Sequence, residues 1–162
     1  MSYLEDNLGR EQDIGSYTFT AEEIIDFARK YDPQPFHLDP EAAKNSLFGG
    51  LCASGWHTTA VFMKLNVASI VQATKEALKR GETPPVFGPS PGFENLKWSK
   101  PVYAGDTITY KRTVHTLRPL ASRPGWSMLA MSSRAFNQNG EEVLSFENAA
   151  MVKLPPRAHP EK

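Results

Sequence analysis

Two side chains that can move a proton lie close together in the segment YDPQPFHLDP, residues 31–40. Asp32 carries a carboxylate, and five residues later His37 carries an imidazole, the group that ordinarily titrates nearest to neutral pH. Pro33 and Pro35 stiffen the backbone between them, and catalysis needs its groups held in place before the substrate arrives. The segment therefore fits a proton-transfer site. It also fits a stiff connector, in which Asp32 ends or caps a helix and His37 is a packed structural histidine.

The rest of the sequence lacks the patterns of most other catalytic classes. The four histidines have no H-E-x-x-H spacing, Cys52 is the one cysteine, and no G-x-G-x-x-G or P-loop occurs. No G-x-S-x-G surrounds Ser54, so we expect it to cap a helix and not to act as a nucleophile. We expect His57 to pack within the long helix, with the mouth of a pocket as its alternative place, and His115 to be structural or exposed. The sequence thus predicts no metal and no cofactor.

The composition is that of a globular chain without a strongly charged partner. Of 162 residues, 40% are hydrophobic, and 18 basic residues balance 18 acidic ones, which argues against nucleic acid and membrane surfaces as partners. A single cysteine favours a reducing compartment, and no apolar run suits a signal peptide or a membrane span. We expect a soluble cytoplasmic protein with one domain over 1–162, a polar segment over about 1–14 and a frayed tail over about 155–162.

The stretch before the 31–40 segment predicts a strand followed by a short helix. Residues 16–19 have the composition of a strand. Thr20 and Glu23 then have the spacing of a capping box, and apolar residues recur at helical spacing after them. A helix over 21–31 would therefore deliver Asp32 at its C-terminal end.

Two further helices are expected after the 31–40 segment. Asp39 would cap a helix that begins at Pro40, because proline is tolerated in the first turn. The longest helix would begin at the Ser54-Gly55 pair and end at about Lys79. Its residues 61–71 are apolar nearly all round, which predicts a helix buried within the protein.

The second half of the chain predicts an antiparallel sheet. Residues 84–92 are rich in proline and glycine and are expected to form an irregular connector, and 137–140 (NQNG) is a hairpin turn signal. Four β-like runs are FENLKWSKPVY, DTITYKRTVHTL, WSMLAMSSRAF and EVLSFENAAMVKL. About five antiparallel strands can cover one face by wrapping around the buried helix, which is the α+β hot-dog fold. The open edges of such a sheet predict a homodimer or a higher homo-oligomer.

Three motifs in register resemble those of the MaoC-like hydratases and dehydratases, the (R)-specific enoyl-CoA hydratase group. In that family a loop Asp-x-Asn-Pro-x-His is followed by a glycine that opens the central helix and by a Pro-Val-x-x-Gly-Asp turn. The corresponding segments here are DPQPFH (32–37), SGW (54–56) and PVYAGD (101–106). Gln34 stands where the family usually has Asn, and Ser54 stands where many members have His. Neither difference removes a proton-transfer group.

The resemblance implies a hydro-lyase that adds water to an acyl-CoA thioester or removes it. Hydration of an α,β-unsaturated thioester needs a base to activate water at Cβ, a proton for Cα, and donors for the negative charge that develops on the thioester oxygen. Asp32 and His37 would act as acid and base, in an order that the sequence leaves open. Gly55 would offer a free N–H in the first helical turn.

The resemblance and the residues together define a candidate site and its partner. The substrate would be an acyl-CoA, with coenzyme A entering as part of the substrate, in fatty acid metabolism. The candidate residues are Asp32 and His37 for catalysis, Gly55, Ser54 and Trp56 for binding the substrate and its oxyanion, and Gln34 and Pro35 for positioning the loop.

Two other functions of the hot-dog fold remain open. A hot-dog acyl-CoA thioesterase often carries a carboxylate on the central helix, and here the first acidic residue of that helix is Glu76. A non-catalytic protein that binds an acyl thioester is the third possibility, and retention of both Asp32 and His37 argues against it. The acyl-chain length, the physiological direction and the residues that bind the phosphates of coenzyme A are not determined by the sequence.

Overall fold

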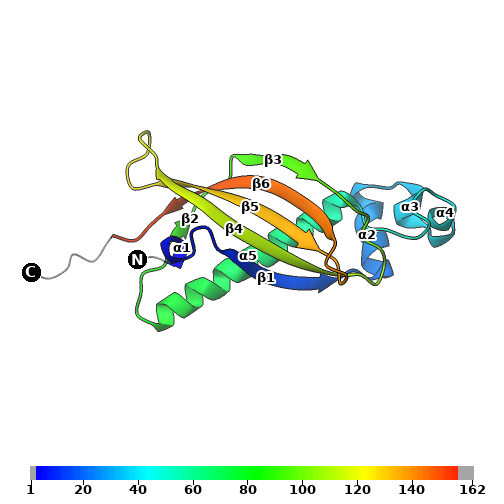
Figure 1. The fold of residues 1–162 in the computed structure, drawn as a ribbon, viewed down its shortest axis with the longest axis horizontal. Coiled ribbons are helices and arrows are strands. Elements are labelled where there is room, and N and C mark those ends of the chain that lie inside the picture. The colour runs from blue at the N-terminus through cyan, green and yellow to red at the C-terminus, as the bar shows by residue number, and fades with distance from the viewer. Residues whose placement is uncertain (1–2, 157–162) are drawn as a thin grey trace, which may run out of the picture.

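One long helix lies across a curled antiparallel sheet in the computed structural model, which describes residues 3–156 (Figure 1). Within these residues the sheet has six strands in the order β1-β4-β5-β6-β2, and β3 also pairs with β6. The strands are β1 Glu11–Thr18, β2 Val86–Phe87, β3 Gly92–Lys97, β4 Thr107–Pro119, β5 Ser127–Phe136 and β6 Glu142–Lys153. The helix is α5, Gly55–Lys79. The predicted fold class, a sheet wrapped around a central helix, is confirmed.

Alternating burial along the central strands places the core on the face of the sheet that meets α5. On β4, Ile108, Tyr110 and Val114 are buried, and the residues between Ile108 and Tyr110 and on either side of Val114 are more exposed. Successive side chains of a strand point to opposite faces, so one face is apolar. The hydroxyl of Tyr110 donates a hydrogen bond to the carbonyl of Thr58 at 2.9 Å, which ties the sheet to α5.

The short helices form where the capping residues predicted them. Helix α2 spans Ala21–Tyr31, and Thr20 accepts a hydrogen bond from the N–H of Glu23 at 3.2 Å. Helix α4 spans Pro40–Lys44, and Asp39 accepts from the N–H of Glu41 at 2.9 Å. Between them lies the four-residue helix α3, Pro35–Leu38, and helix α1 is Tyr3–Asp6. Helices α2, α3 and α4 gather at the end of the molecule where α5 begins, whereas α1 lies toward the other end (Figure 1).

Helix α5 has the predicted bounds but is not buried all round. Ser54 caps it by accepting from the N–H of Trp56 at 3.3 Å. One face is buried on the sheet, but Met63, Val67 and Val71 on another face are 50%, 49% and 45% exposed. The expectation of a fully enclosed helix is therefore wrong for a single chain, because the sheet covers only one side of the helix.

Three other expectations are corrected by the strands and by the N-terminal residues. Strand β1 begins at Glu11, earlier than the expected start at residue 16. The N-terminal segment is not only polar surface, because Leu4 and Ile14 are buried in the core. Residues 84–92 are not wholly irregular, since β2 pairs with the end of β6. The expected frayed tail lies largely outside the described residues.

Two features are absent from residues 3–156, a membrane-spanning helix and a cluster of metal ligands. No helix within 3–156 has a stretch both long and apolar enough to traverse a lipid bilayer. In the same residues, no three side chains among His, Cys, Asp and Glu are grouped so that they would hold a metal ion.

Candidate functional site

Asp32 and His37 lie side by side because α2 ends and α3 begins between them. Asp32 is the residue after α2, and its N–H donates to the carbonyl of Ala28 at 2.9 Å. Pro35 starts α3 and so places His37 in a single tight turn that points back toward Asp32. The His37 Nε2 atom is 3.4 Å from Asp32 Oδ2, and only 7% and 18% of the two side chains are exposed.

The Asp32 carboxylate is held by two neighbouring side chains. The Ser54 hydroxyl donates to Oδ2 at 2.7 Å, and the Gln34 amide donates to Oδ1 at 2.8 Å. Burial alone would raise the pKa of Asp32, but these two hydrogen bonds and the nearby imidazole of His37 outweigh it and lower that pKa. Asp32 is therefore a carboxylate near neutral pH.

The main chain fixes the orientation of the His37 ring. Its Nδ1 atom is 2.6 Å from the carbonyl oxygen of Cys52, which only accepts hydrogen bonds. Nδ1 therefore carries a hydrogen, and in the neutral ring Nε2 has the free lone pair. This lone pair faces the Asp32 carboxylate, which is also an acceptor. A water molecule beside the two atoms would find an acceptor for each of its hydrogens.

The first turn of α5 offers an amide beside this pair. Ser54 precedes the helix, and the N–H of Gly55 donates no hydrogen bond to any group within residues 3–156. First-turn N–H groups lie at the positive end of the helix dipole and lack intrahelical acceptors. An oxygen that gains negative charge would be stabilised there.

These groups share one cavity of about 500 Å³. Asp32, His37, Gly55 and Trp56 all line it, and Gln34 lines it next to Asp32. Trp56 stands at its mouth with half of its surface exposed. The predicted site residues are thus brought together by the end of α2, by α3 and by the start of α5, and Pro35 acts through the start of α3.

Two contributors to the cavity were not identified from the sequence. One is the carbonyl of Cys52, which has no sequence signal because every residue carries a carbonyl. The other is Trp98, which lines the cavity and meets Trp56 edge to face with the ring centroids 5.0 Å apart. Its place three residues before the Pro101-Val102 turn is the one signal that would have pointed to it.

His57 and His115 lie away from the cavity, the first packed and the second exposed, as predicted. His57 is buried and stacks on Phe27 with the ring centroids 4.5 Å apart. Its Nδ1 has no hydrogen-bond partner among the described residues, and burial lowers its pKa despite the opposing effect of Glu23. His115 is exposed on β4 and is hydrogen bonded to Ser132. Neither ring lines the cavity that holds Asp32 and His37.

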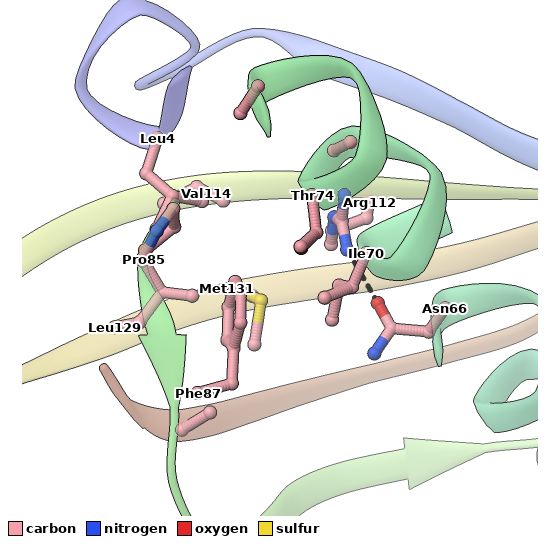
Figure 2. Close-up of a pocket in the computed structure, with 13 residues that line it drawn as sticks. Leu4, Asn66, Ile70, Thr74, Pro85, Phe87, Arg112, Val114, Leu129 and Met131 are labelled. Carbon is pink, nitrogen blue, oxygen red and sulfur yellow. Dashed lines mark hydrogen bonds between the residues drawn. The ribbon is translucent and has the colours of Figure 1, made fainter. Parts of the chain in front are cut away.

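A second, smaller cavity of about 60 Å³ lies between the C-terminal half of α5 and the sheet (Figure 2). Its walls are mostly apolar, and its polar groups include Arg112, which donates to Asn66 Oδ1 at 2.6 Å. No carboxylate or imidazole lines it. This smaller cavity therefore offers no proton-transfer pair.

Comparison with family models and with proteins of known sequence gives matches along most of the chain. A model described as "MaoC like domain" matches residues 4–121. YdeM of Bacillus subtilis (strain 168) is 24% identical over 94% of this chain and 99% of its own length. A UPF0336 protein of Streptomyces avermitilis is 27% identical over 88% of this chain and 86% of its own length.

Solved structures are similar over nearly the full length. A MaoC-like dehydratase from Rhodospirillum rubrum has a TM-score of 0.77 and 34% identity, covering 96% of this chain and 99% of that one. The (R)-hydratase from A. caviae, described as involved in PHA biosynthesis, has a TM-score of 0.62 and 26% identity, covering 91% and 96%.

Proposed function

Because the chain belongs to the MaoC-like domain family, a family of hydratases and dehydratases, we propose that it is a hydro-lyase that acts on an acyl-CoA thioester. The observation that carries the proposal is the Asp32–His37 pair, 3.4 Å apart on one cavity with the Gly55 amide. Coenzyme A enters as part of the substrate, and the reaction requires no other cofactor. Similarity to the (R)-hydratase from A. caviae supports an enoyl thioester as the substrate class.

In the proposed reaction a water molecule lies beside the pair, within hydrogen-bond reach of both His37 Nε2 and the Asp32 carboxylate. His37 removes one proton from the water as its oxygen bonds to Cβ of the enoyl group, and the electrons of the double bond move toward the thioester oxygen. The carboxylate stabilises the imidazolium that forms. One of the two groups then delivers a proton to Cα, so the net change is the addition of H and OH. The reverse path removes water, and the same geometry serves both directions.

The Gly55 N–H is proposed to stabilise the thioester oxygen while it carries negative charge. A backbone donor of this kind costs nothing to reorganise when the charge develops, because the helix already fixes it. Loss of one such donor typically lowers kcat by about 10²- to 10³-fold. A backbone amide cannot be deleted by substitution, so its role is tested through the side chains that surround it.

A thioesterase is the second candidate, and α5 argues against it. The stretch of α5 from Gly55 to Gln72 contains no Asp or Glu, and the first acidic residue is Glu76. A helix carboxylate is what many hot-dog thioesterases use. The two functions differ in product, because a thioesterase releases free CoA and a hydro-lyase does not.

The test is the absorbance of the conjugated enoyl group of crotonyl-CoA, followed with purified protein. Hydration removes this absorbance, and we expect no decrease with His37→Ala. We expect Asp32→Asn to lower kcat by about 10²- to 10⁴-fold, the range typical for removing a general acid or base. His115→Ala is the matched control, since that imidazole lies outside the cavity. Hydration by His37→Ala at the wild-type rate would refute the assignment. Release of free CoA with an unchanged enoyl group would favour the thioesterase.

We further propose that the working unit is a homodimer or higher homo-oligomer built on α5 and the sheet edges. Met63, Val67, Val71 and Leu78 project from one side of α5, and each is at least 45% exposed. Apolar surface of this kind on a long helix usually marks an interface. A second copy of the chain would cover it and enclose the helix that the sheet leaves half open.

A further inference from the structure

Trp98 lies flat against the glycine that opens α5. A methyl group built on Gly55 would come within 2.3 Å of Trp98 Cδ2 and 2.4 Å of Cε2. Carbon atoms do not approach so closely, so the indole contacts the Gly55 backbone directly. Gly55 has no positive φ, so glycine is required here for space and not for backbone conformation.

The indole is fixed in this position although 44% of its surface is exposed. Trp98 Nε1 donates to Thr59 Oγ1 at 3.2 Å, and the Thr59 hydroxyl itself donates to the carbonyl of Gly55 at 2.9 Å. Trp56 packs on the indole edge to face. The next residue, Ser99, donates its N–H to Val143 of β6 at 3.0 Å. The ring is therefore held from α5 and from the sheet.

A thioester bound to the Gly55 amide must share this space with the indole. A hydrogen bond places the carbonyl oxygen about 2.9 Å from the amide nitrogen, and the acyl Cα is two bonds away from that oxygen. The Gly55 Cα, which the indole covers, is directly bonded to the same nitrogen. Groups attached to the acyl Cα therefore lie within reach of the ring. A flat enoyl group can lie along an aromatic face, and a methyl group at Cα starts in the same plane. Hydration makes Cα tetrahedral, so the branch then leaves the plane and meets the ring.

We propose that Trp98 is a specificity-determining residue, whose indole over Gly55 restricts the site to acyl groups that are unbranched at Cα. The inference rests on the proposed function, because it assumes that the thioester oxygen binds the Gly55 amide. The hydrogen bond to Thr59 holds the indole ring in place. Without that bond, the ring has room to turn outward into solvent.

The experiment compares three enoyl-CoAs in wild type and Trp98→Ala: crotonyl-CoA, its 2-methyl derivative and its 3-methyl derivative. We expect Trp98→Ala to raise the ratio of kcat/KM for the 2-methyl substrate over crotonyl-CoA by about tenfold or more, as one methyl group in a tight site commonly does. The 3-methyl ratio should change less than twofold, because that branch is at Cβ. Trp98→Phe keeps a flat ring and should retain most of the wild-type preference.

Thr59→Val supplies a second test that keeps the shape of the helix. It removes the acceptor for Trp98 Nε1 and should raise the 2-methyl ratio about two- to fivefold, whereas Thr59→Ser, which keeps the hydroxyl, should not. Equal changes in the 2-methyl and 3-methyl ratios, or no change in either, would overturn the inference. If wild type hydrates none of the three, the proposed function fails. The restriction by the Trp98 indole is then tested by whether Trp98→Ala raises the affinity for isobutyryl-CoA relative to butyryl-CoA.

Discussion

At the scale of single residues, the site depends on groups that hold the catalytic pair and do not react. Ser54 and Gln34 each occupy one oxygen of Asp32, and the carbonyl of Cys52 occupies Nδ1 of His37. The free positions that remain are Nε2 of His37 and the outer lone pairs of the carboxylate. Two acceptors then lie side by side, an arrangement that favours a water molecule in the cavity that donates a hydrogen bond to each.

Ser54→Ala should move the acid limb of the pH–rate profile to higher pH. The Ser54 hydroxyl is the main hydrogen bond that lowers the pKa of Asp32, so its loss raises that pKa. Asp32 acts as a carboxylate, and activity falls as pH drops through its pKa. The fall should therefore begin at a higher pH, measured as kcat/KM against pH. Ser132→Ala is the control, because the Ser132 hydroxyl bonds His115 outside the cavity, and it should leave the pH–rate profile unchanged. An unshifted acid limb in Ser54→Ala would show that the Ser54 hydroxyl does not control the pKa of Asp32.

At the scale of elements, the sequence predicted the helix starts, which are decided by residues close together in the chain. Helices α2, α4 and α5 begin where Thr20, Asp39 and Ser54 accept hydrogen bonds from nearby N–H groups, and these signals lie within three residues of each start. Strand extents were predicted less well. Strand β1 begins at Glu11 because that residue pairs with Thr113, about a hundred residues away, and β2 exists only through its pairing with β6.

The same distinction explains what was found of the site. Asp32 and His37 are five residues apart and joined by prolines, so their proximity could be argued from the sequence. The contact of Trp98 with Gly55 joins residues that are far apart in the chain and depends on how the segment after β3 crosses the start of α5. No pattern along the sequence reports such a packing distance.

Gly55→Ala should lower the free energy of unfolding by about 1–3 kcal/mol, the usual effect of added volume at a filled position. The new methyl group would meet the Trp98 ring, which must then move. Because the clash needs both partners, the same substitution in a Trp98→Ala background should cost little or nothing. Urea unfolding of the four proteins of this cycle measures the coupling. Additive effects would show that the glycine is needed for another reason.

The contact between α5 and α2 should make stability depend on pH. Burial lowers the pKa of His57 in the folded protein, so the unfolded chain binds more protons as the pH falls below neutrality. The free energy of unfolding should therefore decrease from pH 7 to pH 5. His57→Phe, which can still stack on Phe27, should reduce this slope, whereas His115→Phe should not. Urea unfolding at pH 5, 6 and 7 is the measurement, and an unchanged slope in His57→Phe would exclude this origin.

At the scale of the whole molecule, one chain leaves its central helix only half covered. The sheet covers one side of α5 (Figure 1), and the exposed side carries Met63, Val67 and Val71. The sheet also has edges, with β3 exposed along nearly its whole length. Both features are unfavourable for an isolated chain and favourable for an assembly.

Val67→Asp should dissociate the assembly, because it places a charge in the middle of the apolar side of α5. Ala68→Asp is the matched control, since it adds the same charge on the same helix about 100° around its axis. Light scattering coupled to size exclusion should give at least twice the chain mass for wild type and Ala68→Asp, and a smaller mass for Val67→Asp. A monomeric wild type would show that α5 is not the interface.

The hydrogen bond from His37 to the carbonyl of Cys52 has a consequence for how the protein tolerates sequence change. Every amino acid supplies the same carbonyl, so no exchange of the side chain at position 52 deletes the atom that selects the imidazole tautomer. The thiol, whose Sγ is 3.7 Å from the same Nδ1, can be exchanged without removing that carbonyl. The imidazole tautomer of His37 therefore does not depend on which side chain stands at position 52, as long as the path of the backbone is kept.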